Sequence, residues 1–171
     1  MTRRWRHALG AGFGTLALFV TACEGPGLSV PTESEAQAYF AGTSGVTVEI
    51  SGNVVVVNVN QPFQQVRRGG SLWAKVGPYI YLFSGETERL FTDFSGLAGV
   101  RVITRTGVRQ EPVATVLLAR GALTDVTWRR AKNIAGRARL EGTQRPSLLE
   151  DLVRWGEDHT EFEYSAQYVP R

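Results

Sequence analysis

A run of β-branched residues early in the chain most constrains the fold. Residues 54–60 read Val-Val-Val-Val-Asn-Val-Asn, and such a run aggregates unless it is well buried. Residues 46–50 before it alternate between apolar and polar side chains, and Ser51-Gly52-Asn53 between the two segments is typical of a tight turn. The pattern therefore predicts a β-hairpin with one buried face.

A second hairpin is predicted further along the chain. Residues 100–105 and 113–120 are two strand-like segments, separated by the polar loop 106–112. Pro112 is expected just before the second strand, where it deprives the sheet of no hydrogen-bond donor.

The segment between the two hairpins is predicted to be helical. Apolar residues, together with Thr87, recur there at helical spacing, and the set is Leu72, Val76, Ile80, Phe83, Thr87, Leu90, Phe91 and Phe94. Arg67-Arg68-Gly69-Gly70 is expected to be a loop leading into this region, and Pro78 and Ser84-Gly85 are expected to divide it into two helices, with Ser84 capping the second. A strand over residues 79–83 is the alternative, because aromatic and β-branched residues gather there, but the helical periodicity favours a helix.

Three further helices and one strand complete the prediction. Thr32 and Glu35 have capping-box spacing before a short helix that ends near Gly42. A helix from Thr124-Asp125 to about residue 140 should bury Val126, Ala131, Ile134, Ala135 and Ala138. Another begins at Pro146 and ends at Gly156 or shortly beyond, and residues 162–164 suit a short edge strand.

This order of elements predicts the fold class. An antiparallel sheet of about four strands, built from the two hairpins, can bury its apolar face only if the helices pack on it. The expectation is a two-layer α+β domain with the helices on one face.

The N-terminus has the three parts of an export signal. Arg3, Arg4 and Arg6 form a positive segment, and residues 8–20 are apolar and uncharged. The apolar stretch is shorter than the ~20 residues that a membrane-spanning helix needs. Residues 18–23, Leu-Phe-Val-Thr-Ala-Cys, follow it and hold the only cysteine of the chain.

These residues resemble the lipobox of bacterial lipoproteins, in which a branched apolar residue and two small residues precede a cysteine. The resemblance covers residues 1–23 and implies that a diacylglyceryl group joins the Cys23 sulfur, that a lipoprotein signal peptidase cuts before it, and that the freed amine is acylated. The alternative is an ordinary secretory signal cut after Ala22, but a lone thiol in an exported chain invites oxidation.

The resemblance implies a domain organisation and a location. Residues 1–22 are the signal peptide, residues 23–31 the lipidated cysteine and a flexible tether rich in glycine and proline, and residues 32–171 one globular domain. Acyl chains on Cys23 hold the protein on a membrane of the cell envelope. Glu24 is not the aspartate that retains many such proteins in the inner membrane, which favours the outer membrane.

Removal of the leader changes the charge balance. The chain has 19 basic and 16 acidic residues, and Arg3, Arg4 and Arg6 belong to the leader, which has no acidic residue. The mature chain thus has a formal net charge of zero, and nothing in its charge suggests nucleic-acid binding.

Few residues suit catalysis. The only cysteine, Cys23, is expected to carry lipid, so the chain offers no thiol nucleophile. Once the leader is removed, His159 is the only histidine, which excludes a metal site with several histidines in one chain. The best candidate is the segment 157–163, where a strand would place His159, Glu161 and Glu163 on one face. A solvated polar turn is the simpler interpretation, and no metal or other cofactor is expected.

The C-terminal third has a polarised charge distribution. Residues 120–145 hold seven basic and two acidic residues, whereas residues 146–171 hold two basic and six acidic ones. The basic helix could contact anionic headgroups or envelope polymers, and the candidate contacts are Arg129, Arg130, Lys132, Arg137 and Arg139. Charge pairing between this helix and the acidic one after it is the favoured interpretation.

The sequence therefore predicts a lipid-anchored envelope protein with a non-catalytic domain that binds or scaffolds an envelope protein or polymer. The alternative is a hydrolase of an envelope polymer, or a metal-dependent enzyme, that uses residues 157–163.

Overall fold

The two predicted hairpins form the first four strands of a five-stranded sheet. The computed structural model describes residues 28–170. In this part of the chain the strands are β1 (Val46–Ser51), β2 (Val54–Gln61), β3 (Gly99–Thr106), β4 (Glu111–Ala119) and β5 (Glu161–Tyr164). They lie side by side in the order of the sequence, and β5 is the short edge strand that residues 162–164 predicted.

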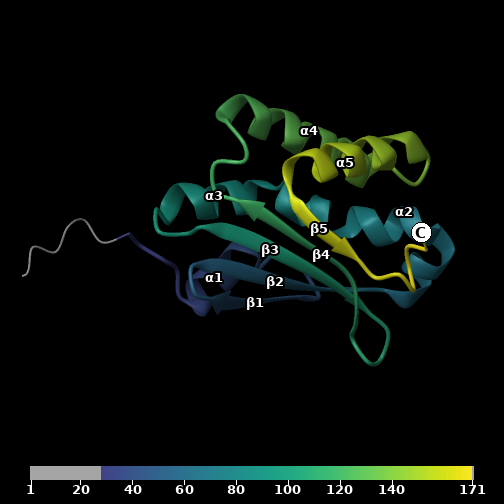
Figure 1. Cartoon of the computed structure of the whole chain (residues 1–171), viewed down its shortest axis with the longest axis horizontal. Coiled ribbons are helices and arrows are strands. Elements are labelled where there is room, and N and C mark those ends of the chain that lie inside the picture. Colours follow the sequence, from purple (N-terminus) through teal and green to yellow (C-terminus); the bar gives the residue numbers. More distant parts are fainter. Residues whose placement is uncertain (1–27, 171) are drawn as a thin grey trace, which may run out of the picture.

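The sheet is mixed, not antiparallel throughout. Each hairpin pairs antiparallel, and so do β4 and β5, but β2 and β3 run parallel with Val57 opposite Val102. Parallel neighbours need a crossover connection, and the helices between β2 and β3 return the chain to the end of the sheet where β2 began (Figure 1). The expected antiparallel sheet of about four strands is thus corrected in strand number and in this central pairing.

Five helices accompany the described part of the sheet and confirm the α+β class. They are α1 (Glu33–Tyr39), α2 (Phe63–Leu82), α3 (Gly85–Asp93), α4 (Asp125–Glu141) and α5 (Pro146–His159). α2 packs on β3 and β4, α1 packs on β1, and α4 and α5 pack on each other and on α2 (Figure 1).

Alternate residues of the strands enter one large core, beside which Val66, Ala74 and Val113 form a small second cluster. Val55, Val57, Val100, Val102 and Val116 are fully buried and share this core with side chains of all five helices. Because successive side chains of a strand point to opposite faces, the residues between them lie on the other face. No element of residues 28–170 packs over that other face, which we call the open face.

The helix over residues 79–83 is confirmed, but its limits differ from the expectation. α2 runs through Pro78, because Val76, Tyr79 and Leu82 are fully buried and their packing outweighs the lost hydrogen bond. The helical region is interrupted at Gly70 and not at Pro78, since the φ of 62° at Gly70 leaves the helical range. The expected division at Ser84-Gly85 is confirmed, because α2 ends at Leu82 and α3 begins at Gly85. The expected loop over residues 67–70 is therefore part of α2, and Ser84 caps α3 by accepting from the Thr87 amide.

The capping predictions for the other helices are confirmed. Thr32 forms a capping box with Glu35, Thr124 caps α4, and Pro146 occupies the first turn of α5. Ala131, Ala135 and Ala138 are buried as expected. Val126 is not, since it is 65% exposed at the start of α4, where Trp128 is buried instead.

Pro112 lies inside β4 and not just before it as expected. It is beside a register shift at Thr104/Arg105, where an irregular ladder tolerates the missing donor.

Gly156 lies within α5 and allows close packing. A Cβ atom there would come within 2.3 Å of Cε1 of Tyr79, a fully buried side chain of α2. The helix continues to His159, so this glycine brings α5 against α2.

We predict that Gly156→Ala destabilises the protein. Alanine favours a helix by up to ~1 kcal/mol over glycine, but overpacking against a core ring costs ~1–3 kcal/mol, so a net loss of about 1–2 kcal/mol is expected. Gly136→Ala in α4 is the matched control, because a Cβ there meets nothing within 4 Å, and it should stabilise by up to ~1 kcal/mol. Chemical denaturation of both variants measures the difference, and equal effects of the two changes would refute the close-packing role.

Candidate functional site

The residues 157–163 do not come together as a site. His159 is the last residue of α5; its Nδ1 lies 2.8 Å from the Trp155 carbonyl oxygen, and its ring stacks on Trp155 at 4.1 Å between centroids. Glu161 and Glu163 belong to β5 and line a shallow hollow on the open face. A single strand through residues 159–163, which would place these three side chains on one face, is not formed, because α5 includes His159 and β5 begins at Glu161. Within residues 28–170, no three histidine or acidic side chains are grouped so that they could hold a metal ion.

Glu157 belongs to a polar cluster between α2, α5 and β5. Its carboxylate lies 3.1 Å from the Lys75 ammonium group, which also lies 5.0 Å from the centre of the Tyr164 ring. The hydroxyls of Tyr79 and Tyr164 are 2.7 Å apart. This cluster fastens the inward side of β5 to the helices, and it thereby fixes where β5 presents Glu161 and Glu163.

Burial determines the protonation of the two tyrosines. It raises the pKa of Tyr79 to about 12 and also raises the pKa of Tyr164, because a buried phenolate would lose its hydration. Both hydroxyls are therefore neutral at physiological pH, and they link α2 to β5 through a neutral hydrogen bond.

The five basic candidates of α4 do not converge on one ligand site. Arg130 stacks on Trp155 of α5, with its guanidinium carbon 4.4 Å from the ring centre. Arg139 donates to the Ile80 carbonyl at 3.2 Å, and Lys132 pairs with Glu88 of α3. Arg129 and Arg137 are exposed. α4 and α5 lie together as predicted. Within residues 28–170, Glu141 at the end of α4 pairs with Arg145, the N-cap residue of α5, but no ion pair joins a basic residue of α4 to an acidic residue of α5, so the predicted charge pairing is wrong.

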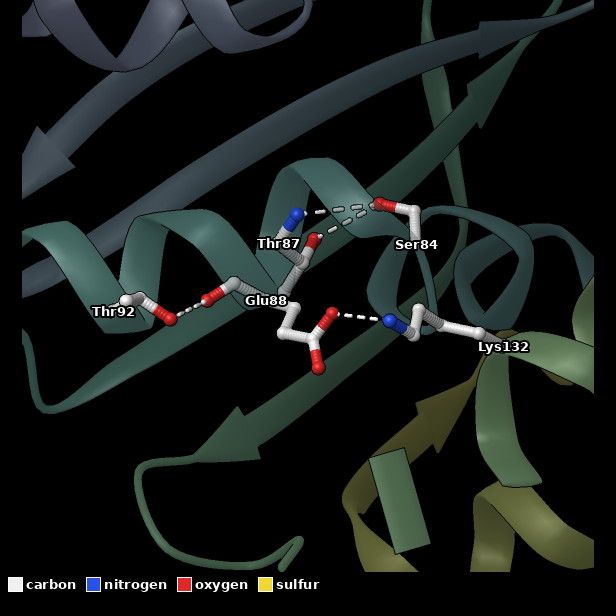
Figure 2. Close-up of polar contacts among 5 residues, drawn as sticks. All are labelled: Ser84, Thr87, Glu88, Thr92 and Lys132. Carbon is white, nitrogen blue, oxygen red and sulfur yellow. Dashed lines mark hydrogen bonds and ion pairs between the residues drawn. The ribbon is translucent and has the colours of Figure 1, made fainter. Parts of the chain in front are cut away.

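One hollow brings two of these cations close to the N-terminus of α3. Its lining includes Lys132 and Arg139 of α4, Ser84 and Gly85 at the start of α3, and Glu86. Figure 2 shows the Lys132 side chain directed at Glu88, one turn into α3. Lys132 is thus already paired with a carboxylate, and Glu86 adds a second carboxylate to the lining of the hollow, so the arrangement suits a contact between helices better than phosphate binding.

The open face has a regular arrangement of outward residues. One cross-strand row reads Glu49, Val56, Arg101, Leu117 and Glu161, and the next reads Thr47, Asn58, Ile103, Thr115 and Glu163. The sequence reasoning missed this surface. Its signal is the alternation of outward Arg101, Ile103 and Arg105 with buried residues along β3, but their neighbours follow only from the strand order and register.

The two sides of the open face differ in how their charges are satisfied. On the β1 side, Asn58 donates to Glu49 at 3.2 Å and Arg105 donates to Asn58 at 3.2 Å. On the β5 side, Arg101, Glu161 and Glu163 line one hollow, and in the described part of the chain none of them forms an ion pair or a side-chain hydrogen bond. The open face thus combines apolar Leu117 and Ile103 with charges that have no partner in residues 28–170.

The predicted lipid attachment at Cys23 lies outside the described residues. The description begins at Leu28, and the Gly96 amide donates to the Ser29 carbonyl at 2.8 Å, which places the start of the domain beside the loop between α3 and β3. No described helix has the length and apolar character to cross a bilayer.

Comparison with models of protein families, with curated proteins and with solved structures finds no match to this chain.

We predict that Tyr79 makes the stability of the protein sensitive to alkaline pH. The unfolded phenol titrates near pH 10, whereas the pKa in the fold is about 12. The unfolded state therefore binds fewer protons between these values, so this stabilisation is complete below pH 10 and is lost as the pH rises towards 12. The loss is on the order of 2 to 3 kcal/mol.

Urea denaturation of wild type and Tyr79→Phe at pH 8, 10, 11 and 12 measures this effect. The variant should be less stable at pH 8, since it loses the hydrogen bond to Tyr164, but its stability should fall less steeply above pH 10. Parallel curves for the two proteins would show that Tyr79 does not carry the dependence.

Proposed function

We propose that this chain is a lipid-anchored protein of the bacterial cell envelope, and that its domain binds a partner without catalysing a reaction. The observation that carries the anchor is the single cysteine directly after Val20, Thr21 and Ala22 and a basic, then apolar leader. The outer membrane is the proposed location, because Glu24 follows the cysteine.

The anchor has a geometric consequence for the domain. Four residues lie between Cys23 and Leu28, and the five residue-to-residue steps of a fully extended chain span at most ~18 Å. The Ser29 carbonyl is bonded to Gly96, and Ala98 is bonded to Asn53. The end of the sheet with the β1–β2 turn and the α3–β3 loop therefore stays near the lipid surface. The strands then extend away from that surface, so the open face is directed sideways and not at the lipid.

The side-chain arrangement supports binding over catalysis. The His159 ring lies against the Trp155 carbonyl and ring. Glu157 forms an ion pair with Lys75. Glu161 and Glu163 lie on the open face, away from both. A general acid–base site needs these groups within hydrogen-bond reach of one substrate atom. Unpaired charges around apolar side chains on the open face instead suit a complementary protein surface.

We predict that Cys23→Ala moves the protein from the membrane fraction to the soluble fraction. One acyl chain gives marginal membrane binding and two or more give stable binding, so the loss should be nearly complete. Gly25→Ala in the same tether is the control and should stay on the membrane. Cell fractionation and intact mass of the wild type measure the result. A wild-type chain that lacks any acyl increment would disprove the anchor.

We also predict that His159→Ala preserves the membrane fraction and the cellular function of the protein. Its half-buried ring stacks on Trp155 at the end of α5, so the change should cost about 0.5–1.5 kcal/mol of stability, as for one aromatic stacking contact. A loss of function as severe as gene deletion, in a variant that is still folded at the growth temperature and present in the membrane fraction, would favour the enzyme alternative.

A further inference from the structure

The unpaired charges of the open face have a symmetrical placement around Leu117. Arg101 of β3 and Glu161 of β5 both pair in register with Leu117 of β4, one from each side. Strands lie about 4.8 Å apart, so the backbones of Arg101 and Glu161 are about 10 Å apart and equidistant from β4. Arg101 is half-buried and Glu161 is exposed, and both side chains line the same hollow.

We propose that a second copy of this chain packs on the β3–β4–β5 side of the open face, with a twofold axis along β4. A rotation about an axis in the interface plane that follows β4 exchanges the positions over β3 and β5. Arg101 of each copy then lies over Glu161 of the other, and Leu117 lies over Leu117. The row of Arg101, Leu117 and Glu161 is thus complementary to itself, which is the condition for a closed dimer.

The local packing at Leu117 suits this central position. A Cβ atom on Gly99 would come within 3.0 Å of Leu117 Cδ1, so the leucine side chain leans over the glycine of the neighbouring strand. The Leu117 side chain therefore lies along the sheet surface and forms an apolar centre, with Arg101 on one side and Glu161 on the other. Leucine at the centre and opposite charges at the rim are the usual anatomy of a protein interface.

The position on β3–β5, and not on β1–β2, follows from the charges. Glu49, Asn58 and Arg105 already satisfy one another on the β1 side, whereas no ion pair within residues 28–170 uses Arg101, Glu161 or Glu163. A second copy supplies the missing partners of Arg101 and Glu161, and it supplies each of them twice because the two pairs are related by symmetry. The same axis places Glu163 over Ile103 of the other copy, so Glu163 takes no part in these pairs.

This inference rests on the proposed lipid anchor, because the interface is small. Two strands of eight and nine residues and an edge strand of four offer less than the ~800 Å² per partner of a standard interface, so we expect weak association in dilute solution. Anchoring on one membrane confines the copies and raises their effective concentration, which makes a weak interface effective.

Cross-linking on native membranes tests the dimer. Stacked sheets lie about 10 Å apart, beyond the ~7 Å that a disulfide tolerates between Cα atoms, so the reagent is a short bifunctional maleimide. Leu117→Cys places a thiol beside the axis and should give a covalent dimer. Thr47→Cys, on β1 of the same face, is the matched control and should give at least tenfold less.

Charge exchange identifies the pairs. In the Leu117→Cys chain, Arg101→Glu alone and Glu161→Arg alone should each lower the cross-linked fraction at least tenfold, since each homodimer then holds two like-charged pairs. Expressed together with tags of different size, the two variants should form a heterodimer at close to the original level, because both of its pairs are opposite in charge. Such recovery also shows that both variants fold.

The outcomes separate this inference from the proposed function. A membrane-bound Leu117→Cys chain that does not cross-link, equal cross-linking at Thr47→Cys, or a mixture that does not recover overturns the dimer and leaves the anchor standing. A chain found only in the soluble fraction overturns the anchor and, with it, this inference.

Discussion

The parallel pairing of β2 with β3 is the constraint on which the rest of the structure depends. Two neighbouring parallel strands need a crossover, and α2 and α3 form it over one face of the sheet. α2 provides the surface on which α5 packs, and α4 packs on α5 in turn. Because the helical layers build up on one side, the other side of a five-stranded sheet remains as the open face (Figure 1).

The contact between α2 and α5 sets the edge of that open face. Gly156 lets the Tyr79 ring approach α5, and the Tyr79 hydroxyl then meets Tyr164 on the inward side of β5. Since alternate residues of a strand point in opposite directions, holding Tyr164 inward directs Glu163 and Glu161 outward. Core packing on one side of the sheet thereby positions Glu161, the β5 charge that we assign to the dimer, on the other.

Local patterns in the sequence predicted the elements, but not how distant elements pair. Both hairpins, the helix over residues 79–83 and the caps at Thr32, Ser84 and Thr124 follow from periodicity and side-chain chemistry within a few residues. Nothing local indicates that β2 adjoins β3, so neither the parallel pair nor the neighbours of Arg101 were predictable. The helix charges were misjudged for a similar reason, because Lys132 pairs with Glu88, 44 positions away in the sequence.

The accessibility of the open face on the membrane tests the account most directly. Ile103→Cys places a thiol on β3 beside Arg101, and acylation leaves no other free thiol in the chain. Its rate of labelling by a water-soluble maleimide, measured on vesicles of increasing protein density, should fall several-fold as the dimer forms, while Thr47→Cys on β1 keeps a constant rate. Equal and constant rates for the two thiols at every density would contradict the assignment of this face to a second copy.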